Sequence, residues 1–394
     1  MKNDILYVWL QQATGVASRV TRDLLFRFKS IEELYRCDDF SFLGENHAKC
    51  VARLSSKDTG SAFEVVKKCA SLGVKITGCF ESDYPDLLRR IDSPPAAIYS
   101  IGEYRDLNKA VCVAVVGTRR MTPYGRETAE KFAYDFAKSG VTVVSGLAKG
   151  VDTAAHRGAV MAGGYTVAVL GNPIGEIYPR ENEAAFRTLY KRGLVMSEMY
   201  PGCPRTRADF PNRNRIISGL SRATVIAEAG EGSGALITAR YAIAQGKQLY
   251  AVPGAIGAEN AGTNDLIKRG CSVATDPYDV IAPLSLEFPE TVRVYEPSVT
   301  GRLMSYGASN GAVRKSVNAF PEGAAALEPF APSGTEKMND GPAVAALKKA
   351  GVPMTADELA RVTGVGIAEL LSQLTVDEIE GKIVKSPGGR YSAV

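Results

Sequence analysis

Several residue types and motifs are scarce or missing in this 394-residue sequence, and each shortage excludes a class of protein. Only two histidines, His47 and His156, accompany seven cysteines, and no two cysteines form a CxxC pair. We therefore expect no metal site, and the odd number of cysteines favours a reducing cytoplasm. Because no run of eighteen apolar residues occurs, we expect no membrane-spanning segment. The interrupted apolar start, Met1–Gln12, indicates a first helix rather than a secretion signal.

The common nucleotide-binding motifs are also missing. A dinucleotide site requires GxGxxG after its first strand, but residues 117–122 at that place contain only one glycine. No GxxxxGK[ST] loop occurs either, so the sequence shows no machinery for ATP hydrolysis. We expect no cofactor and assign no catalytic residue.

The charge balance is mild, with 47 Lys and Arg against 43 Asp and Glu and a net charge of +4. A polybasic nucleic-acid binder is thereby excluded, and any such site must be a local cluster of cations. The hydrophobic fraction of 45% is ample for folded cores, and the length suggests two or three domains.

The central segment, 78–285, alternates apolar strands with amphipathic helices. Such a pattern predicts an α/β fold with a Rossmann-like, doubly wound and mostly parallel sheet that is covered on both faces. The predicted strands are 111–116, 141–144, 165–170, 194–196, 223–227 and 248–252, and the predicted helices include 126–138 and 152–161.

Two smaller units and a linker are predicted on either side of the centre. Residues 1–77 have helical periodicity and suggest a small SAM-like or helix-hairpin-helix-like domain. Gly, Pro, Ser and Ala supply 24 of the 57 residues from 286 to 342, which is typical of a linker. Residues 343–394 read as three helices and a hairpin, the outline of a winged helix, with Thr355 capping the second helix.

Glycine and serine follow five of the predicted strands. In parallel sheets ligands bind at the carboxyl ends of the strands, where glycine lets backbone amides approach an anion. Arg119 adds a phosphate donor to the first of these loops. Together the loops suggest a cleft for a phosphate, although any one of these glycines could simply turn the chain.

The most distinctive segment, 205–221, places Phe210 among four arginines. An aromatic platform beside a cationic track is how proteins hold single-stranded nucleic acid without reading its sequence. Equally, Phe210 could pack inward while the arginines pair with carboxylates, and composition does not separate the two.

In order along the chain, these motifs resemble the bacterial DNA-processing protein A (DprA, or Smf) family. The segments that carry the resemblance are VGTR at 116–119, SGLAKGVD at 145–152, FPNRNRII at 210–217, EA at 228–229 with SG at 233–234, AVPG at 251–254 and GTNDLI at 262–267.

The resemblance implies a cytoplasmic, non-enzymatic protein that binds incoming single-stranded DNA in natural transformation. It implies protection of that DNA, loading of RecA in place of single-strand-binding protein, and a homodimer. The DNA-binding residues that it implies are Gly117, Thr118, Arg119, Gly146, Lys149, Arg207, Phe210, Arg213, Asn214, Ser233 and Gly234.

Two other functions remain open from the sequence. A Rossmann-like nucleotide hydrolase of the lysine-decarboxylase-like group could use Glu228 and Glu231 as a carboxylate pair. A transcriptional regulator could read DNA with the C-terminal unit, but its six basic and six acidic residues make a weak duplex reader. We interpret His156 as structural and Asp152 as the cap of its own helix.

Overall fold

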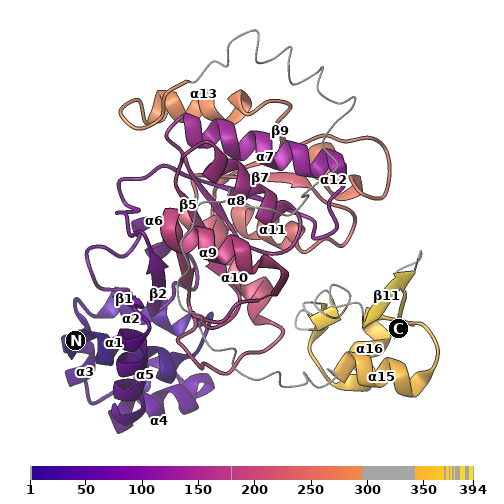
Figure 1. Cartoon of the computed structure of the whole chain (residues 1–394). Helices are drawn as coiled ribbons and strands as arrows, with labels where there is room; N and C mark the ends of the chain where they lie inside the picture. Colours follow the sequence, from indigo (N-terminus) through magenta and orange to yellow (C-terminus); the bar gives the residue numbers. More distant parts are fainter. Residues whose placement is uncertain are drawn as a thin grey trace.

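A nine-stranded sheet forms the centre of the protein in the computed structural model (Figure 1). The structure describes residues 2–178, 180–294 and 342–393, the last stretch with short gaps at 368–369, 372, 375–376, 378–381 and 387–389. Most of the predicted linker, 295–341, therefore lies outside the described residues. None of the described helices is long and apolar enough to cross a membrane.

The strand order is β1-β2-β6-β5-β4-β3-β7-β8-β9. The predicted α/β sheet is confirmed: β3 to β9 are mutually parallel, whereas the β1–β2 and β2–β6 pairs are antiparallel. The strands are β1 Lys75–Gly78, β2 Ala97–Gly102, β3 Cys112–Gly117, β4 Thr142–Ser145, β5 Thr166–Leu170, β6 Leu194–Ser197, β7 Ala223–Glu228, β8 Gln248–Ala251 and β9 Ser272–Val273. The antiparallel strands β1 and β2 and the short β9 were not predicted from the sequence.

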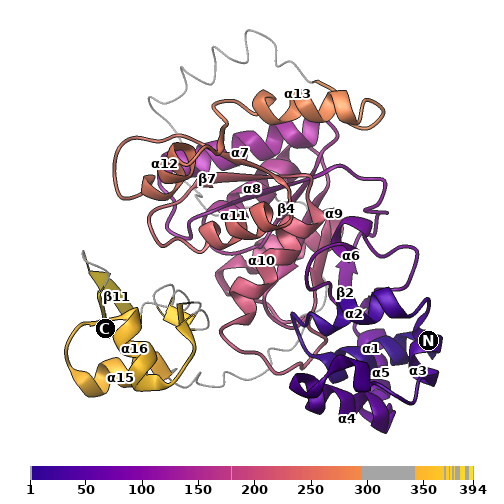
Figure 2. The ribbon, with the colours of Figure 1, turned by 180° about the vertical axis from the view of Figure 1, so that it is seen from behind.

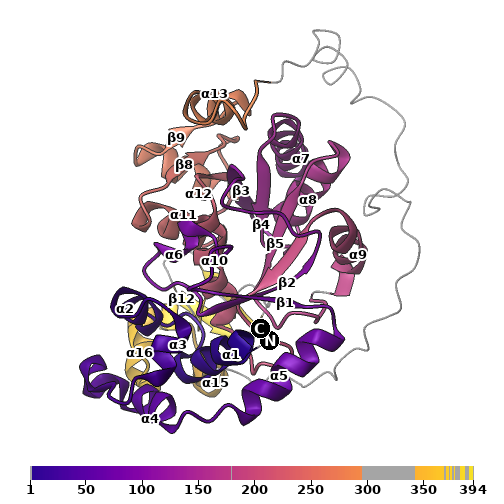
Figure 3. The same ribbon diagram turned by 90° about the vertical axis from the view of Figure 1, so that its left-hand side faces the viewer.

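Helices cover both faces of the sheet, with α7, α8 and α9 on one side and α10, α11 and α12 on the other (Figure 3). Alternate residues of β3 serve the two faces: Val113 and Val115 pack with α7, while Ala114 and Val116 join the core under α10. The order of connections reverses between β3 and β7, so the switch point lies at the carboxyl end of β3. The helices are α6 Asp86–Arg89, α7 Pro123–Lys138, α8 Val151–Met161, α9 Glu183–Arg192, α10 Asp209–Leu220, α11 Ala235–Ala244, α12 Ala261–Lys268 and α13 Tyr278–Glu287.

The N-terminal helices share one apolar core with the sheet. Buried side chains of α1 such as Trp9 belong to the same cluster as Ile216 of α10. Polar contacts cross the same boundary, because Tyr99 of β2 donates to Gln11 Oε1 at 2.6 Å. The helices are α1 Lys2–Thr14, α2 Val20–Arg27, α3 Ile31–Arg36, α4 Ala48–Ser56 and α5 Gly60–Ser71.

The C-terminal unit has its own small core, built around Leu347, Leu359, Leu374 and Tyr391. It contains a three-stranded sheet in the order β10-β12-β11. The predicted cap is present: Thr355 and Glu358 form a reciprocal capping box at the start of α16. The elements are α15 Pro342–Ala350, β10 Met354–Thr355, α16 Ala356–Thr363, β11 Ile383–Ser386 and β12 Arg390–Ala393. This unit and the N-terminal helices lie at the same end of the molecule, on opposite sides (Figures 1 and 2).

Candidate nucleic-acid interface

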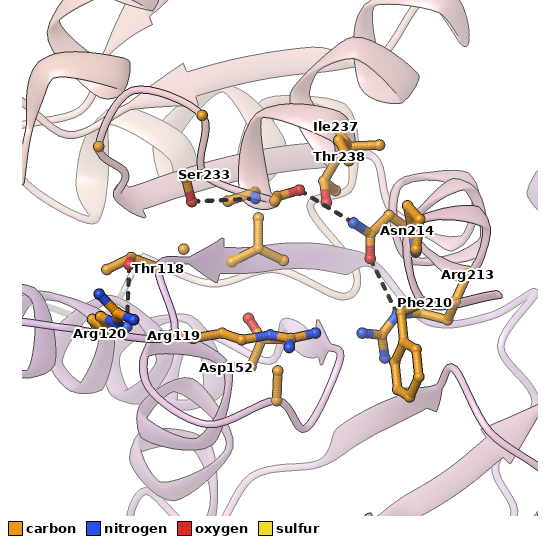
Figure 4. Close-up of a pocket in the computed structure, with 18 of the residues that line it drawn as sticks. Thr118, Arg119, Arg120, Asp152, Phe210, Arg213, Asn214, Ser233, Ile237 and Thr238 are labelled. Atoms are coloured by element: carbon orange, nitrogen blue, oxygen red, sulfur yellow. Dashed lines mark hydrogen bonds between the residues drawn. The ribbon is translucent and has the colours of Figure 1, made fainter. Parts of the chain in front are cut away.

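Two adjoining cavities open at the carboxyl edge of the sheet, beside the switch point. The larger, of about 500 Å³, and the smaller, of about 240 Å³, share a wall formed by Arg119, Phe210 and Arg213 (Figure 4). The smaller cavity is lined by four cationic side chains, those of Arg119, Arg120, Lys149 and Arg213. The single carboxylate among its described lining residues is that of Glu181. A cationic concavity at this edge is suited to an anion.

The loop after β3 is held from β7. Thr118 N donates to the carbonyl of Glu228 at 2.8 Å. The Glu228 carboxylate accepts from Thr122 N at 2.9 Å and from Thr122 Oγ1 at 2.6 Å. Thr118 Oγ1 accepts from Arg120 N at 3.2 Å, which leaves its own proton to donate to a ligand. Glu228 is thus a structural anchor and does not line either cavity.

Close approach of two loops requires glycine at position 150, just before α8. Gly150 has φ +91°, and a Cβ there would lie 2.4 Å from the carbonyl oxygen of Thr118. Because only glycine tolerates both that backbone conformation and that proximity, the Thr118 and Lys149 loops can converge on one site. Leu147, in the loop between β4 and α8, is a non-glycine residue with φ 53°. Such strained backbone conformations are concentrated at functional sites.

Arg213 lines both cavities but is also a structural tie. Its guanidinium donates to the carbonyl of Gly146 at 2.6 Å and to that of Val169, so it holds the ends of β4 and β5 together. Burial lowers the pKa of Arg213 to about 10, against the attraction of Asp152, and Arg119 adds repulsion. The pKa of Asp152 is raised, because the cost of burial exceeds the attraction of Arg213.

The prediction that Asp152 caps its own helix is wrong. Gly150 is the N-cap of α8, and no side chain caps this helix end. Asp152 Oδ2 instead accepts from Gly146 N at 3.1 Å. The carboxylate sits within the first turn and fixes the preceding loop. It therefore supports the Gly146 backbone from the helix side while Arg213 supports it from α10.

Phe210 is half-buried on the shared wall of the two cavities. Its ring lies 5.2 Å from that of Tyr178, tilted by 47°, and the guanidinium carbon of Arg119 lies 5.9 Å from the Phe210 ring centre. On its other side, a Cβ at Gly171 would come within 2.8 Å of the Phe210 ring, so the missing side chain makes room for it. Phe210 is therefore neither a core residue nor fully exposed, and it stands next to a cation.

The structure brings ten of the eleven predicted DNA-binding residues to these cavities. Gly146 and Lys149 line the smaller one, and the larger is lined by Gly117, Thr118, Arg119, Phe210, Arg213, Asn214, Ser233 and Gly234. Asn214 Nδ2 donates to the carbonyl of Gly234 at 3.3 Å and so joins α10 to the loop before α11. The eleventh residue, Arg207, lines neither cavity and forms an ion pair with Asp377 of the C-terminal unit.

Sequence reasoning missed Arg120, Tyr178 and Glu181 as lining residues. Arg120 directly follows Arg119, and this neighbour was its only signal in the sequence. Tyr178 precedes a proline in the loop after β5. His156 is fully buried and lines neither cavity; its Nδ1 lies 2.7 Å from Thr166 Oγ1. Burial lowers the pKa of His156 to about 3, and the charge of Arg213 adds to that effect. No group of three or more potential metal ligands occurs among the described residues.

Comparison with known proteins matches both the fold and the site-bearing segment. The model of the DNA recombination-mediator protein A family matches residues 75–285, and that of the DprA winged helix domain matches residues 341–389. Protein Smf of Synechocystis is 30% identical over 407 aligned residues, which cover 99% of each chain.

Two solved structures are similar. DNA processing protein A of Streptococcus pneumoniae has a TM-score of 0.61 and 32% identity, over 70% of this chain and 95% of that one. The Helicobacter pylori protein has a TM-score of 0.50 and 29% identity, over 54% and 96%, and its structure concerns its mode of binding single-stranded DNA.

The fold and site define a Rossmann-like protein with a cationic cleft at the switch point and a C-terminal winged helix. The chain belongs to the DNA recombination-mediator protein A family, also called DprA or Smf.

Proposed function

We propose that this protein binds single-stranded DNA without reading its sequence, in the two cavities at the carboxyl edge of the sheet. The observation that carries the proposal is the shared wall, where Arg119 stands beside the half-buried ring of Phe210. A cation and an aromatic side chain in one groove suit a phosphate and its adjoining base. Family membership and the DNA-binding relative from Helicobacter pylori support the same function.

Each part of the site has a distinct role in this proposal. The amides of the Gly117–Arg119 loop and the Thr118 hydroxyl hold one phosphate, and Arg119 neutralises it. Phe210 stacks on a base or a sugar, and Lys149 follows the backbone beyond. Arg213 acts mainly by holding the strand ends that form the floor, since its hydrogen bonds go to backbone carbonyls.

The cellular role that we propose is protection of incoming DNA during natural transformation. In this role the protein acts as a homodimer that displaces single-strand-binding protein and helps to load RecA, without catalysing a covalent step. Family membership supports this role. Burial of the Glu228 carboxylate against Thr122 argues against the hydrolase, which needs that carboxylate at its substrate.

The decisive experiment measures binding of oligo-dT and of a duplex of the same length over a salt series. We expect preference for oligo-dT and a log–log salt slope of roughly −0.7 per phosphate contact. Arg119→Ala should weaken binding of every single-stranded sequence alike and make this slope shallower, because phosphate contacts carry no base information.

The matched control is Arg192→Ala. Arg192 is an exposed cation at the C-terminal end of α9, close to the start of β6 and so at the opposite edge of the sheet from the cavities. This variant removes the same charge at a distance from the cavities, so the affinity for oligo-dT should stay at the parent value. Equal binding by the Arg119→Ala and parent proteins would refute the assignment of the loop.

A further inference from the structure

A buried ion pair joins the C-terminal unit to the segment beside the candidate DNA site. Arg207, two residues before α10, pairs with Asp377, and the exposed fractions of the two side chains are 6% and 0%. Gln373 Nε2 also donates to Asp377 Oδ1 at 3.3 Å, so the carboxylate is held within its own unit. The contact joins the segment that carries Phe210 to the winged helix, across 170 residues of sequence.

A second contact lies at the cavity itself. Ile383 and Val384 of β11 line the larger cavity together with Arg119 and Phe210. Ile383 belongs to the core of the C-terminal unit, whereas Val384 is 54% exposed and adds an apolar side chain to the wall of the cavity. One part of the unit therefore lines the larger cavity, and a second part pairs with Arg207 in the segment that carries Phe210.

The chemistry of the ion pair imitates the proposed ligand. An aspartate carboxylate and a DNA phosphate are both oxyanions, and an arginine guanidinium binds either of them through charge-assisted hydrogen bonds. Arg207 cannot be buried against Asp377 and also contact a phosphate at the cavity. A phosphate that replaces the Asp377 carboxylate offers Arg207 an equivalent oxyanion, which lowers the cost of separating the buried pair.

We propose that the winged-helix unit is an internal competitor of single-stranded DNA, with Asp377 occupying the position of a phosphate on Arg207. This inference rests on the proposed function and names the regulation of that site. In the docked state β11 narrows the larger cavity and Arg207 is withheld. Binding of a DNA strand exchanges one oxyanion for another and releases the unit, which then exposes the surface that faced the site.

The group that the unit presents to Arg207 is acidic rather than basic, which agrees with the neutral charge of the unit. Six acidic residues balance six basic ones in 343–394, which suits docking against an arginine-rich segment better than reading a duplex. A unit that served as a second DNA-binding surface would instead present a cation to the cavity.

The test compares Asp377→Asn with the parent chain in oligo-dT binding at fixed low salt. Asparagine keeps the shape but removes the charge, so the docked state loses the charge–charge attraction between Asp377 and Arg207. The apparent Kd is the intrinsic Kd divided by the undocked fraction, and we expect it to fall by about three- to tenfold. Asp357→Asn is the matched control, since it removes the same charge from an exposed position at the start of α16. It should leave the Kd unchanged.

Hydrogen exchange of the parent chain separates docking from unfolding. On addition of oligo-dT we expect faster exchange in β11, with α16 protected as before because the unit stays folded. Slower exchange in β11, or an unchanged or higher Kd for Asp377→Asn, would overturn the proposal and indicate a clamp on the DNA. If neither parent nor variant binds oligo-dT at low salt, the proposed function fails rather than the docking alone.

Discussion

Single residues at the edge of the sheet divide into those that face the cavities and those that hold the edge together. Arg119 and Arg213 are both arginines in glycine-rich or asparagine-rich motifs, and the sequence treats them alike. In the structure Arg213 is buried and donates to two backbone carbonyls, while Arg119 extends along the cavity (Figure 4). The difference arises because α10 points Arg213 beneath the loops that carry Arg119.

His156 has a measurable consequence for acid stability. Its pKa is about 3 in the folded protein against 6.5 for an ordinary histidine, so the unfolded chain binds the extra proton between these values. The contribution of His156 to the free energy of unfolding is therefore fully present above pH 6.5 and declines as the pH falls below that value. We expect a loss of about 1.4 kcal/mol per pH unit from this group, measured by urea unfolding between pH 6.5 and 5.

Replacement of His156 by Asn isolates this effect. Asparagine retains a polar group near the position of Nδ1 for Thr166 and cannot titrate, so this part of the pH slope should disappear. His47→Asn is the control variant, because it removes the other histidine of the chain, which is exposed. An unchanged slope for the His156 variant would show that the histidine is not buried in its neutral form.

At the scale of elements, helix α7 depends on a carboxylate from a neighbouring strand. Thr122 is the N-cap of α7 and accepts from Gly125 N at 3.1 Å, while Glu228 of β7 binds both Thr122 groups. A Cβ at Gly125 would fall 1.9 Å from Glu228 Oε2, so glycine is needed for this approach. The strand thus fixes the start of the helix and, with it, the Arg119 loop.

Glu228→Gln should lower the free energy of unfolding by about 1–3 kcal/mol, because charge-assisted hydrogen bonds to a buried group are lost. Affinity for oligo-dT should fall at the same time, since the Arg119 loop loses its anchor. Both are measured on the purified variant, by urea unfolding and by a binding titration.

Glu231→Gln provides the comparison within the same β7–α11 loop. Glu231 lines the larger cavity and is exposed, so its stability change should stay within about 0.5 kcal/mol. Loss of this negative charge should not weaken DNA binding. A Glu228 variant that matches the parent in both measurements would contradict the anchoring role.

On the scale of the whole molecule, the N-terminal helices and the sheet form one structure rather than two. Glu198, at the end of β6, pairs with Arg215 of α10 at 2.6 Å and accepts from Ala17 N at 3.0 Å. Both side chains of the pair are almost fully buried, with exposed fractions of 5% and 3%. One carboxylate therefore ties an N-terminal loop, the sheet and the site-bearing helix together.

Glu198→Gln should destabilise the protein by about 3–5 kcal/mol, because Arg215 would remain buried without a counter-charge. Trp9, the single tryptophan, reports the unfolding from α1 by its fluorescence. As a control, Glu183→Gln breaks the exposed Glu183–Arg187 pair and should cost at most about 0.5 kcal/mol. Equal unfolding midpoints for the two variants would mean that the Glu198–Arg215 pair contributes little to the stability of the protein.

The local pattern of the sequence determined most of the fold class and pointed to the edge of the sheet that carries the candidate site. Apolar strands such as 111–116 and 141–144 alternate with amphipathic helices, and this periodicity alone predicts a covered parallel sheet. The strand-end glycines and the 205–221 segment then point to one edge, because carboxyl ends of parallel strands converge there. Strands β1 and β2 were not predicted because their antiparallel pairing, β1 with β2 and β2 with β6, depends on partners outside the local pattern.

Only the tertiary structure decided which charges face the cavities and which face one another. Arg207, Arg213 and Arg215 lie within nine residues of the chain, yet one pairs with the winged helix, one binds backbone carbonyls and one pairs with Glu198. Their partners come from different parts of the chain and are brought near by the packing of α10 between the sheet, the N-terminal helices and the C-terminal unit. Composition shows only that the charges exist, whereas their burial and their distances to other groups determine which partner each charge contacts.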